Sequence, residues 1–220
     1  YQCVDACLAK AVVHEEQPQI TEVNVGAVIV APGFKAFDPH QYDTYGYGRL
    51  KNVITSMEFE RILSASGPFE GHLVRPSDKL APKKIAWLQC VGSRGLQNGA
   101  HPYCSGVCCM YAIKEAVIAK EHCHGELDTA IFFMDMRTYG KEFERYYDRA
   151  RNEAGVRFIR SRIHSVDPAG PGSEDLEITY VDDNGETKSE VFDLVVLSIG
   201  LEVDAELKAT AERLGVEVDA

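Results

Sequence analysis

Short apolar runs alternate with stretches of helical spacing along most of the chain. The strand-like runs have the near-continuous apolar character of parallel strands that are buried on both faces. They cover 26–31, 85–89, 129–134, 156–163 and 193–200. Apolar residues that would line one helical face occur in 52–66, 110–120 and 139–154. This alternation predicts an α/β fold with a parallel sheet and right-handed crossovers.

A hairpin is predicted toward the C-terminal end of this pattern. The runs 176–181 and 190–192 flank Asp182-Asp183-Asn184-Gly185, whose residue types favour a tight turn. The aromatic residues of 139–154 are interpreted as core packing of one helical face rather than as a stacking surface.

Four cysteines lie between the predicted strand 85–89 and the predicted helix 110–120. This cysteine quartet consists of Cys90, Cys104, Cys108 and Cys109. Thiolates at the start of a helix meet the positive end of its dipole and free backbone N–H groups, which favours an anionic metal-thiolate centre. The strand is followed by CVGSRG, which lacks the G-x-G-x-x-G spacing of a dinucleotide site. A redox cluster is therefore expected here, and a nicotinamide cofactor is not.

Four interpretations of the quartet compete on spacing alone. A disulfide between Cys104 and Cys108 is disfavoured, because one helical turn separates Cβ atoms by about 5 to 6 Å and a disulfide needs about 3.5 to 4.5 Å. Structural zinc also takes four thiolates, but usually in C-x2-C pairs that are absent here. Unligated buried cysteines are the third interpretation. Iron–sulfur ligation, which tolerates irregular spacing, is favoured.

Residues near the quartet are expected to have supporting roles. Three roles are open for Arg94: pairing with a carboxylate, offsetting the charge of a cluster, or serving as an ordinary surface charge. His101 is expected to act as a hydrogen-bond donor behind the ligands. Asp135 and Arg137 end a predicted strand where a nucleotide fold recognises a ribose. Without a phosphate loop, they are interpreted as a structural ion pair.

Composition narrows the classes of function. A net charge of -11 over 220 residues, without an offsetting basic stretch, argues against nucleic-acid binding. No apolar run reaches the roughly 18 residues of a membrane span, and no signal-peptide pattern is present, so a cytoplasmic location is expected. Seven cysteines, four of them clustered, fit a reducing compartment better than a disulfide framework.

The two ends suggest a fragment. The chain opens on Tyr1 with Cys3 and Cys7 one helical turn apart, and it closes after LGVEV, which has the character of an interrupted strand. We expect this sequence to be an internal piece of a longer protein.

Four motifs carry a resemblance that covers most of the chain. They are VGAVIVAPGF, YGYGRLKNVITSMEFERILSASGP, CVGSRG with YCSGVCCMYAIKEA, and DMRTYGKEFERYYDRA. The sequence resembles the A subunit of heterodisulfide reductase and the related subunit of the quinone-interacting membrane-bound oxidoreductase complex. The resemblance implies an iron–sulfur flavoprotein oxidoreductase with a thioredoxin-reductase-like core. It also implies that the cysteine quartet binds a 4Fe-4S cluster.

The same resemblance implies a three-layer, Rossmann-type fold of the FAD/NAD(P)-binding kind, with flavin-domain strands and an inserted second domain. The expected segments are a truncated ferredoxin-like tail with a crossing strand (1–35), a linker region with a helix (36–84), the insert with the quartet (85–192) and a return to the flavin domain (193–220). Gly33 and Gly200 match the crossings as candidate flavin contacts, with a structural turn as the alternative. Cys3 and Cys7 match half of a ferredoxin-like cluster motif.

The expected function is electron transfer within a larger enzyme. FAD is expected in the full-length protein but not bound by this chain, which has no G-x-G-x-x-G loop and is expected to be inactive alone. Expected partners are other heterodisulfide reductase-like subunits and electron-donor subunits, with a homodimer as a further expectation. The alternative is a non-catalytic docking scaffold with a Zn(Cys)4 site or free thiols.

Overall fold

The computed structural model describes residues 1–96, 99–123 and 126–217. These residues form two units, Tyr1–Gly33 and Phe34–Ala220, and each unit is described by itself. Val218, the last residue of the interrupted strand expected over LGVEV, lies outside the described residues.

The first unit contains one helix, α1 (Gln2–Ala6), followed by irregular chain. The strand predicted over 26–31 is wrong: these residues form no strand, and their side chains are exposed, with Ile29 at 92%. A strand needs a neighbour to pair its backbone N–H and C=O groups. Among the described residues no strand runs beside 26–31, so its apolar pattern alone does not make it a strand.

The second unit is built around a parallel sheet of five strands in the order β2-β9-β3-β4-β5. The strands are β2 (Val53–Thr55), β3 (Lys84–Val91), β4 (Asp128–Phe133), β5 (Arg157–Arg160) and β9 (Leu194–Ile199). Every neighbouring pair is parallel. The predicted α/β fold with a parallel sheet is confirmed. The sheet draws its strands from three of the expected segments, because β2 precedes residue 85 and β9 follows residue 192.

Helices form in the three predicted stretches, but Val53–Thr55 at the start of the predicted helix 52–66 form strand β2 instead, because they pair with β9. The helices are α2 (Ser56–Leu63) after β2, α3 (Cys108–His122) after β3, and α4 (Phe143–Asn152) after β4. Helix α2 begins with a complete capping box, in which the Thr55 hydroxyl accepts from the Glu58 backbone N–H and the Glu58 carboxylate accepts from the Thr55 N–H. No helix in the described part of the chain is long and apolar enough to cross a membrane.

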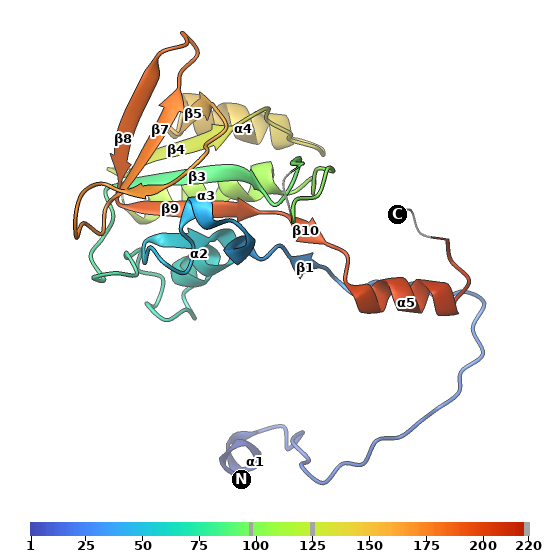
Figure 1. Ribbon diagram of the computed structural model, residues 1–220. Helices are drawn as coiled ribbons and strands as arrows, with labels where there is room; N and C mark the ends of the chain where they lie inside the picture. Colours follow the sequence, from blue (N-terminus) through green and yellow to red (C-terminus); the bar gives the residue numbers. More distant parts are fainter. Residues whose placement is uncertain (97–98, 124–125, 218–220) are drawn as a thin grey trace. The chain divides into compact units, whose positions relative to one another are not determined.

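The parallel sheet is the middle one of three layers (Figure 1). Ile85 and Trp87 of β3 pack among the side chains of α2, α3 and α4 on one face. Ala86 and Leu88 point to the opposite face, as alternation along a strand requires. That face is covered by residues of an antiparallel sheet and by residues 37–45, where the short helices η1 (Pro39–Gln41) and η2 (Asp43–Tyr45) lie. The predicted three-layer fold is confirmed.

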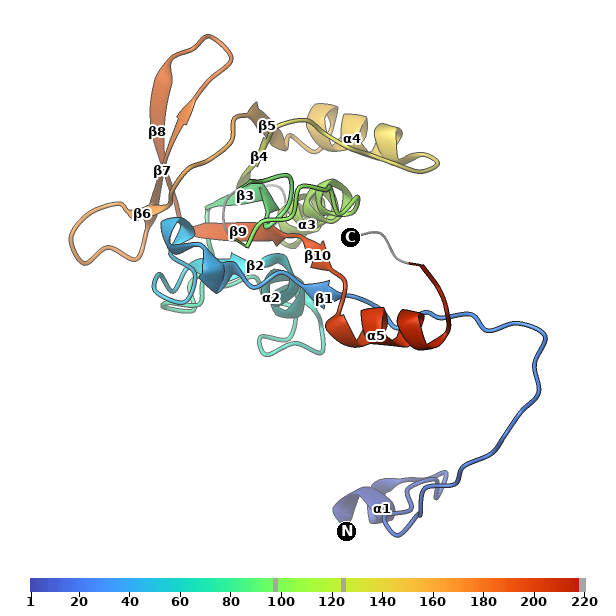
Figure 2. The same ribbon diagram turned by 45° about the vertical axis from the view of Figure 1, so that its right-hand side comes forward.

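The antiparallel sheet contains β6 (Asp167–Pro168), β7 (Leu176–Val181) and β8 (Thr187–Phe192). The predicted hairpin is confirmed as β7 and β8, and Figure 2 shows it rising across the direction of β3 and β9. Asp182 holds the turn, since its Oδ1 accepts from the backbone N–H groups of Asn184 at 2.9 Å and Glu186 at 3.0 Å.

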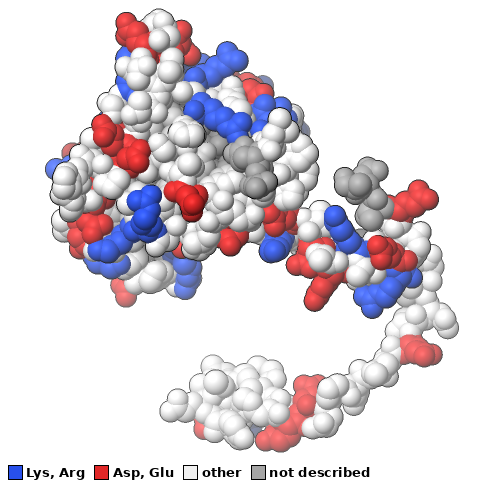
Figure 3. Space-filling model, viewed as in Figure 1, with Lys and Arg blue, Asp and Glu red and all other residues white. Residues whose placement is uncertain are grey.

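Two short strands form a separate two-stranded sheet. Strand β1 (Lys35–Ala36) pairs antiparallel with β10 (Leu201–Glu202), and α5 (Ala205–Arg213) follows. On the face drawn in Figure 3, acidic and basic side chains are interspersed.

A buried carboxyl group lies between β3 and α3. The Trp87 indole Nε1 donates to Glu115 Oε2 at 2.8 Å, and Glu115 Oε1 has no hydrogen-bond partner among the described residues. Burial raises the pKa of Glu115 well above its usual value, and the Trp87 hydrogen bond only partly opposes that rise.

Replacing Glu115 with Gln is expected to flatten the pH dependence of stability. Because the pKa of Glu115 is raised on folding, its stabilising effect is complete below the unfolded value of about 4.3 and is lost as pH rises above it. Urea unfolding between pH 4 and pH 8 should show wild type losing stability relative to Glu115→Gln. The exposed Glu121, on the same helix, provides the control Glu121→Gln. Parallel pH profiles for wild type and Glu115→Gln would contradict the assignment.

Candidate metal centre

The cysteine quartet lies at the carboxyl edge of the parallel sheet, where α/β folds place their ligands. Cys90 lies near the end of β3, at a bulge in the pairing with β9, and has a positive φ of 63°. Cys108 and Cys109 are the first two residues of α3, and Cys104 lies in the loop before it. The predicted strand-to-helix turn is confirmed. A bulge re-aims the side chain it carries, which accounts for the direction of Cys90.

The quartet thiols are near enough to influence one another. Burial raises the pKa of Cys108 to about 12 and that of Cys109 to about 11, and the neighbouring thiols Cys90 and Cys104 add to both rises. A thiol must lose its proton to bind a metal. Thiols whose pKa values rise together need a nearby positive charge before they can ionise together, and metal ions supply such a charge.

Hydrogen-bond donors lie beside the quartet sulfurs. The Gly106 backbone N–H donates to Cys104 Sγ at 3.4 Å. Burial raises the pKa of Cys90, and the charge and hydrogen bond of the Arg94 side chain oppose that rise.

The two helix cysteines also have donors nearby. The Tyr111 hydroxyl and the Cys108 thiol both donate to the Ile199 carbonyl, and the Arg137 backbone N–H lowers the pKa of Cys109 against the rise that burial causes. Donors of this kind stabilise thiolates rather than neutral thiols, so the surroundings fit an anionic metal-thiolate centre.

Two arginines and one aspartate border the quartet. Arg94 forms a bidentate pair with Asp135, with Nη2 to Oδ2 at 3.1 Å, and Arg137 Nε lies 3.2 Å from Asp135 Oδ1. The expected carboxylate partner of Arg94 and the structural pairing of Asp135 with Arg137 are confirmed. The group keeps one excess positive charge beside Cys90 and Cys104. Sequence reasoning considered Arg94 as a charge that offsets the thiols and missed that Arg137 lies beside them as well.

His101 turns away from the role expected for it. Its Nε2 lies 3.1 Å from Glu202 Oε1, and its ring stacks on Tyr103. These contacts tie the loop before α3 to β10. The expectation that His101 donates a hydrogen bond behind the ligands therefore finds no support in its contacts.

The thiols do not form a closed ligand set as they stand. Over residues 1–96, 99–123 and 126–217, no three His, Cys, Asp or Glu side chains are arranged as a preformed metal site. Ligation by the quartet stays a prediction. Cys3 is exposed in the first unit, and Cys7 is half-buried there, with its Sγ accepting from the Ala11 N–H at 3.4 Å, which lowers its pKa. The partial ferredoxin-like site also stays a prediction.

The two candidate flavin glycines have different surroundings. Gly33 has a positive φ of 83°, and an added Cβ would meet nothing within 4 Å. A Cβ on Gly200 would lie 2.3 Å from Ser93 Oγ and 3.0 Å from Ser105 Oγ. Ser105 Oγ also accepts from the Leu201 N–H at 2.8 Å. Gly200 therefore lets the cysteine-bearing loop pack against the end of β9, and a flavin contact at either glycine stays a prediction.

Replacing Gly200 with Ala is expected to destabilise the fold by about 1 to 3 kcal/mol, because the loop must move to admit a methyl group. The double variant Gly200→Ala with Ser93→Ala should recover part of that loss, since the hydroxyl nearest the new Cβ is then gone. Gly170→Ala is the control, because nothing lies within 4 Å of its Cβ position. Urea unfolding measures all four proteins, and equal stability of wild type and Gly200→Ala would refute the packing role.

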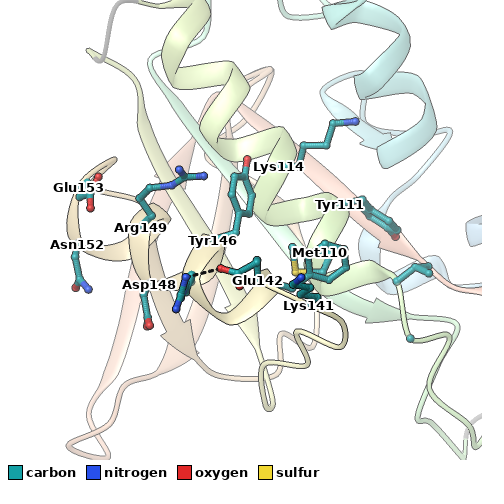
Figure 4. A pocket seen from close by; sticks show the side chains of 14 residues that line it. Met110, Tyr111, Lys114, Lys141, Glu142, Tyr146, Asp148, Arg149, Asn152 and Glu153 are labelled. Carbon is teal, nitrogen blue, oxygen red and sulfur yellow. Dashed lines mark hydrogen bonds and ion pairs between the residues drawn. The ribbon is translucent and has the colours of Figure 1, made fainter.

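A cavity of about 1060 Å³ adjoins the quartet between α3 and α4 (Figure 4). Gly106 and Val107, which separate Cys104 from Cys108, form part of its wall, and Phe143 and Tyr146 of α4 line it. The prediction that this face of 139–154 packs in the core holds for only part of it. Ala150 is buried as expected, whereas Phe143 is 42% exposed and lines the cavity.

No family model matches the chain. Curated relatives do. The chain is 44% identical over 194 residues to the second iron-sulfur A subunit of CoB--CoM heterodisulfide reductase from Methanopyrus kandleri, covering 88% of this chain and 29% of that protein. It is 41% identical over 202 residues to the A subunit of H(2):CoB-CoM heterodisulfide,ferredoxin reductase from Methanothermobacter thermautotrophicus, covering 90% of this chain and 30% of that protein. It is 40% identical over 218 residues to the iron-sulfur A subunit of CoB--CoM heterodisulfide reductase from Methanocaldococcus jannaschii, covering 98% of this chain and 33% of that protein. The chain spans about a third of these relatives or less.

Solved structures give weaker similarities. The sulfide:quinone oxidoreductase of Aquifex aeolicus matches with a TM-score of 0.29 and 14% identity, over 54% of this chain and 25% of that one. LpdA of Mycobacterium tuberculosis matches with a TM-score of 0.33 and 16% identity, over 67% of this chain and 28% of that one. Because both scores are low, the fold assignment rests on the sheet order and not on these similarities.

Proposed function

Because this chain belongs to the family of heterodisulfide reductase A subunits, we propose that it is an electron-transfer part of a larger oxidoreductase in which the cysteine quartet holds a 4Fe-4S cluster. Bound there, such a cluster would accept and release one electron at a time. The chain's own contribution is to hold four thiolates at one edge of the sheet and to stabilise their charge.

One observation carries this proposal. Hydrogen-bond donors lie beside the quartet thiols, and burial makes unligated thiolates unfavourable at Cys90, Cys108 and Cys109. Donors without ionised sulfurs would bring little stabilisation, so the arrangement fits sulfurs that are ionised by a metal. The two arginines bound to Asp135 add positive charge beside Cys90 and Cys104, which suits the net negative charge of an iron–sulfur centre with four thiolate ligands.

The whole protein is proposed to be the enzyme, with FAD as a second cofactor and with other heterodisulfide reductase-like and electron-donor subunits as partners. The relatives are named as subunits of such reductases, which supports this assembly. Cysteine usage favours the cytoplasm as its location. This chain by itself is proposed to lack tight FAD binding and activity, because it has no G-x-G-x-x-G loop.

Metal analysis of anaerobically reconstituted protein tests the proposal. With iron and sulfide supplied, we expect about four irons per chain and a broad absorption band at about 400 nm. One zinc per chain without a visible band would instead establish the Zn(Cys)4 scaffold. Protein that retains neither metal under these conditions would establish a metal-free docking module.

NADH and NADPH are expected to show no saturable binding to this chain. A dinucleotide fold brings its phosphates against glycine backbone after the first strand, but Gly92 at this position faces a side chain of the protein. An added Cβ there would lie 2.2 Å from the ring of Phe37, which is buried. Calorimetry with each dinucleotide at sub-millimolar concentration is the measurement. Micromolar affinity would show that the quartet has not replaced the nucleotide.

A further inference from the structure

Tyr111 and Cys108 converge on one backbone oxygen. The Tyr111 hydroxyl donates to the carbonyl of Ile199 at 2.7 Å, and the Cys108 thiol lies 3.6 Å from the same oxygen. The two side chains are three residues apart on α3, so they lie on the same face of the helix. Ile199 ends β9. One carbonyl thus accepts from a hydroxyl and a thiol together.

The donors available to these groups change when Cys108 binds a metal. A thiol can donate its proton to Ile199, but a metal-bound thiolate has no proton and can only accept. The proton of Cys108 leaves to solvent when the metal binds. The Tyr111 hydroxyl keeps its proton at neutral pH, and its possible acceptors are then the Ile199 carbonyl and the anionic sulfur.

We propose that Tyr111 is a hydrogen-bond donor to the sulfur of Cys108 in the cluster-bound protein, and that it thereby raises the reduction potential of the cluster. The inference rests on the proposed function of the quartet. Hydrogen bonds with a charged acceptor are stronger than neutral ones, so the hydroxyl favours the sulfur over the carbonyl once Cys108 is ionised. Tyr111 touches the ligand and not the iron, so it acts as a positioning and tuning residue.

The surroundings hold the hydroxyl in place for this role. Ser56, the first residue of α2, is buried close to the Tyr111 hydroxyl. Donation from Ser56 to the Tyr111 oxygen would make the Tyr111 hydroxyl a better donor to its next partner. The Tyr111 ring lines the α3–α4 cavity, and Tyr146 lines the same cavity from α4 (Figure 4). Tyr146 packs against Arg149, and no hydrogen bond or charge interaction among the described residues links it to a quartet sulfur.

Hydrogen bonds to cluster sulfurs raise the reduction potential, because they stabilise the state with one more negative charge. Tyr111→Phe removes the donor and keeps the ring. In a dithionite titration of reconstituted protein followed by electron paramagnetic resonance, its midpoint potential is expected to move to a more negative value. Tyr146→Phe, the matched control, is expected to keep the wild-type potential.

Ser56→Ala provides a second variant if Tyr111→Phe does not retain iron. Tyr111 is then intact but loses the partner that strengthens its donation, so a smaller shift in the same direction is expected. Wild-type potentials in the variants that retain a cluster would overturn the role of Tyr111 while leaving the quartet assignment standing. A wild-type protein that assembles no iron would instead remove the proposed function, and this inference with it.

Discussion

Replacing Cys108 with Ser is expected to remove the visible absorption and most of the iron from reconstituted protein. Three thiolates around a cuboid leave one iron without a protein sulfur, and that iron becomes labile. Cys108 is buried at the first position of α3. Iron and sulfide analysis, together with the absorption at about 400 nm, measures the loss of the cluster. Cys104→Ser is expected to behave in the same way.

Cys123 provides the matched control for these variants. It caps the C-terminal end of the same helix, far along α3 from the quartet. Cys123→Ser is expected to bind as much iron as the wild type, so a loss in the quartet variants cannot be ascribed to removal of any one thiol. Unchanged iron in both Cys104→Ser and Cys108→Ser would rule out the quartet as the ligand set.

The fold could be predicted wherever a local pattern determines it. The parallel strands carry near-continuous apolar runs, and the turn at Asp182 to Gly185 has side chains that make the turn by themselves. The run 26–31 carries the same apolar pattern but forms no strand in the described structure. Pairing is a property of two segments, and hydrophobicity reports on only one of them.

The position of β9 shows the same limit at larger scale. Its sequence predicts a buried parallel strand but not its neighbours, and it lies between β2 and β3. Which strands become its neighbours depends on how the chain connections cross the sheet, and residues within β9 do not determine these connections. The sequence pattern therefore indicated the type of element and not its place.

The candidate site divides along similar lines. The quartet and its strand-to-helix turn are local, since they occupy one short stretch between β3 and α3. The pairing of Arg94 with Asp135 joins residues 41 positions apart, and the contact of Tyr111 with Ile199 joins residues 88 apart. Both depend on β4 and β9 lying beside β3. The surroundings of the thiols could therefore not be predicted before the sheet order was known.

The largest loss of stability is expected from Trp87→Ala. Trp87 is 0% exposed in β3, and its ring packs edge-on against Phe59 of α2, with the ring centres 5.4 Å apart. Truncating a buried aromatic side chain to Ala costs about 3 to 5 kcal/mol. The same change leaves the Glu115 carboxyl without its hydrogen-bond donor, which adds about 1 to 3 kcal/mol. Because a domain of this size is stabilised by only about 5 to 15 kcal/mol, Trp87→Ala is expected to be largely unfolded.

Trp87→Phe separates the two contributions, since it keeps an aromatic ring in the core and removes only the indole N–H. We expect it to fold with a loss of about 1 to 3 kcal/mol, part of which returns when Glu115→Leu removes the unpaired carboxyl as well. Trp87 is the only tryptophan, so urea unfolding is followed by far-ultraviolet circular dichroism rather than by fluorescence. If Trp87→Phe is as unstable as Trp87→Ala, the hydrogen bond to Glu115 and not the packing holds this part of the core. If Trp87→Ala remains as stable as the wild type, neither contact between β3 and its covering helices has the weight assigned to it.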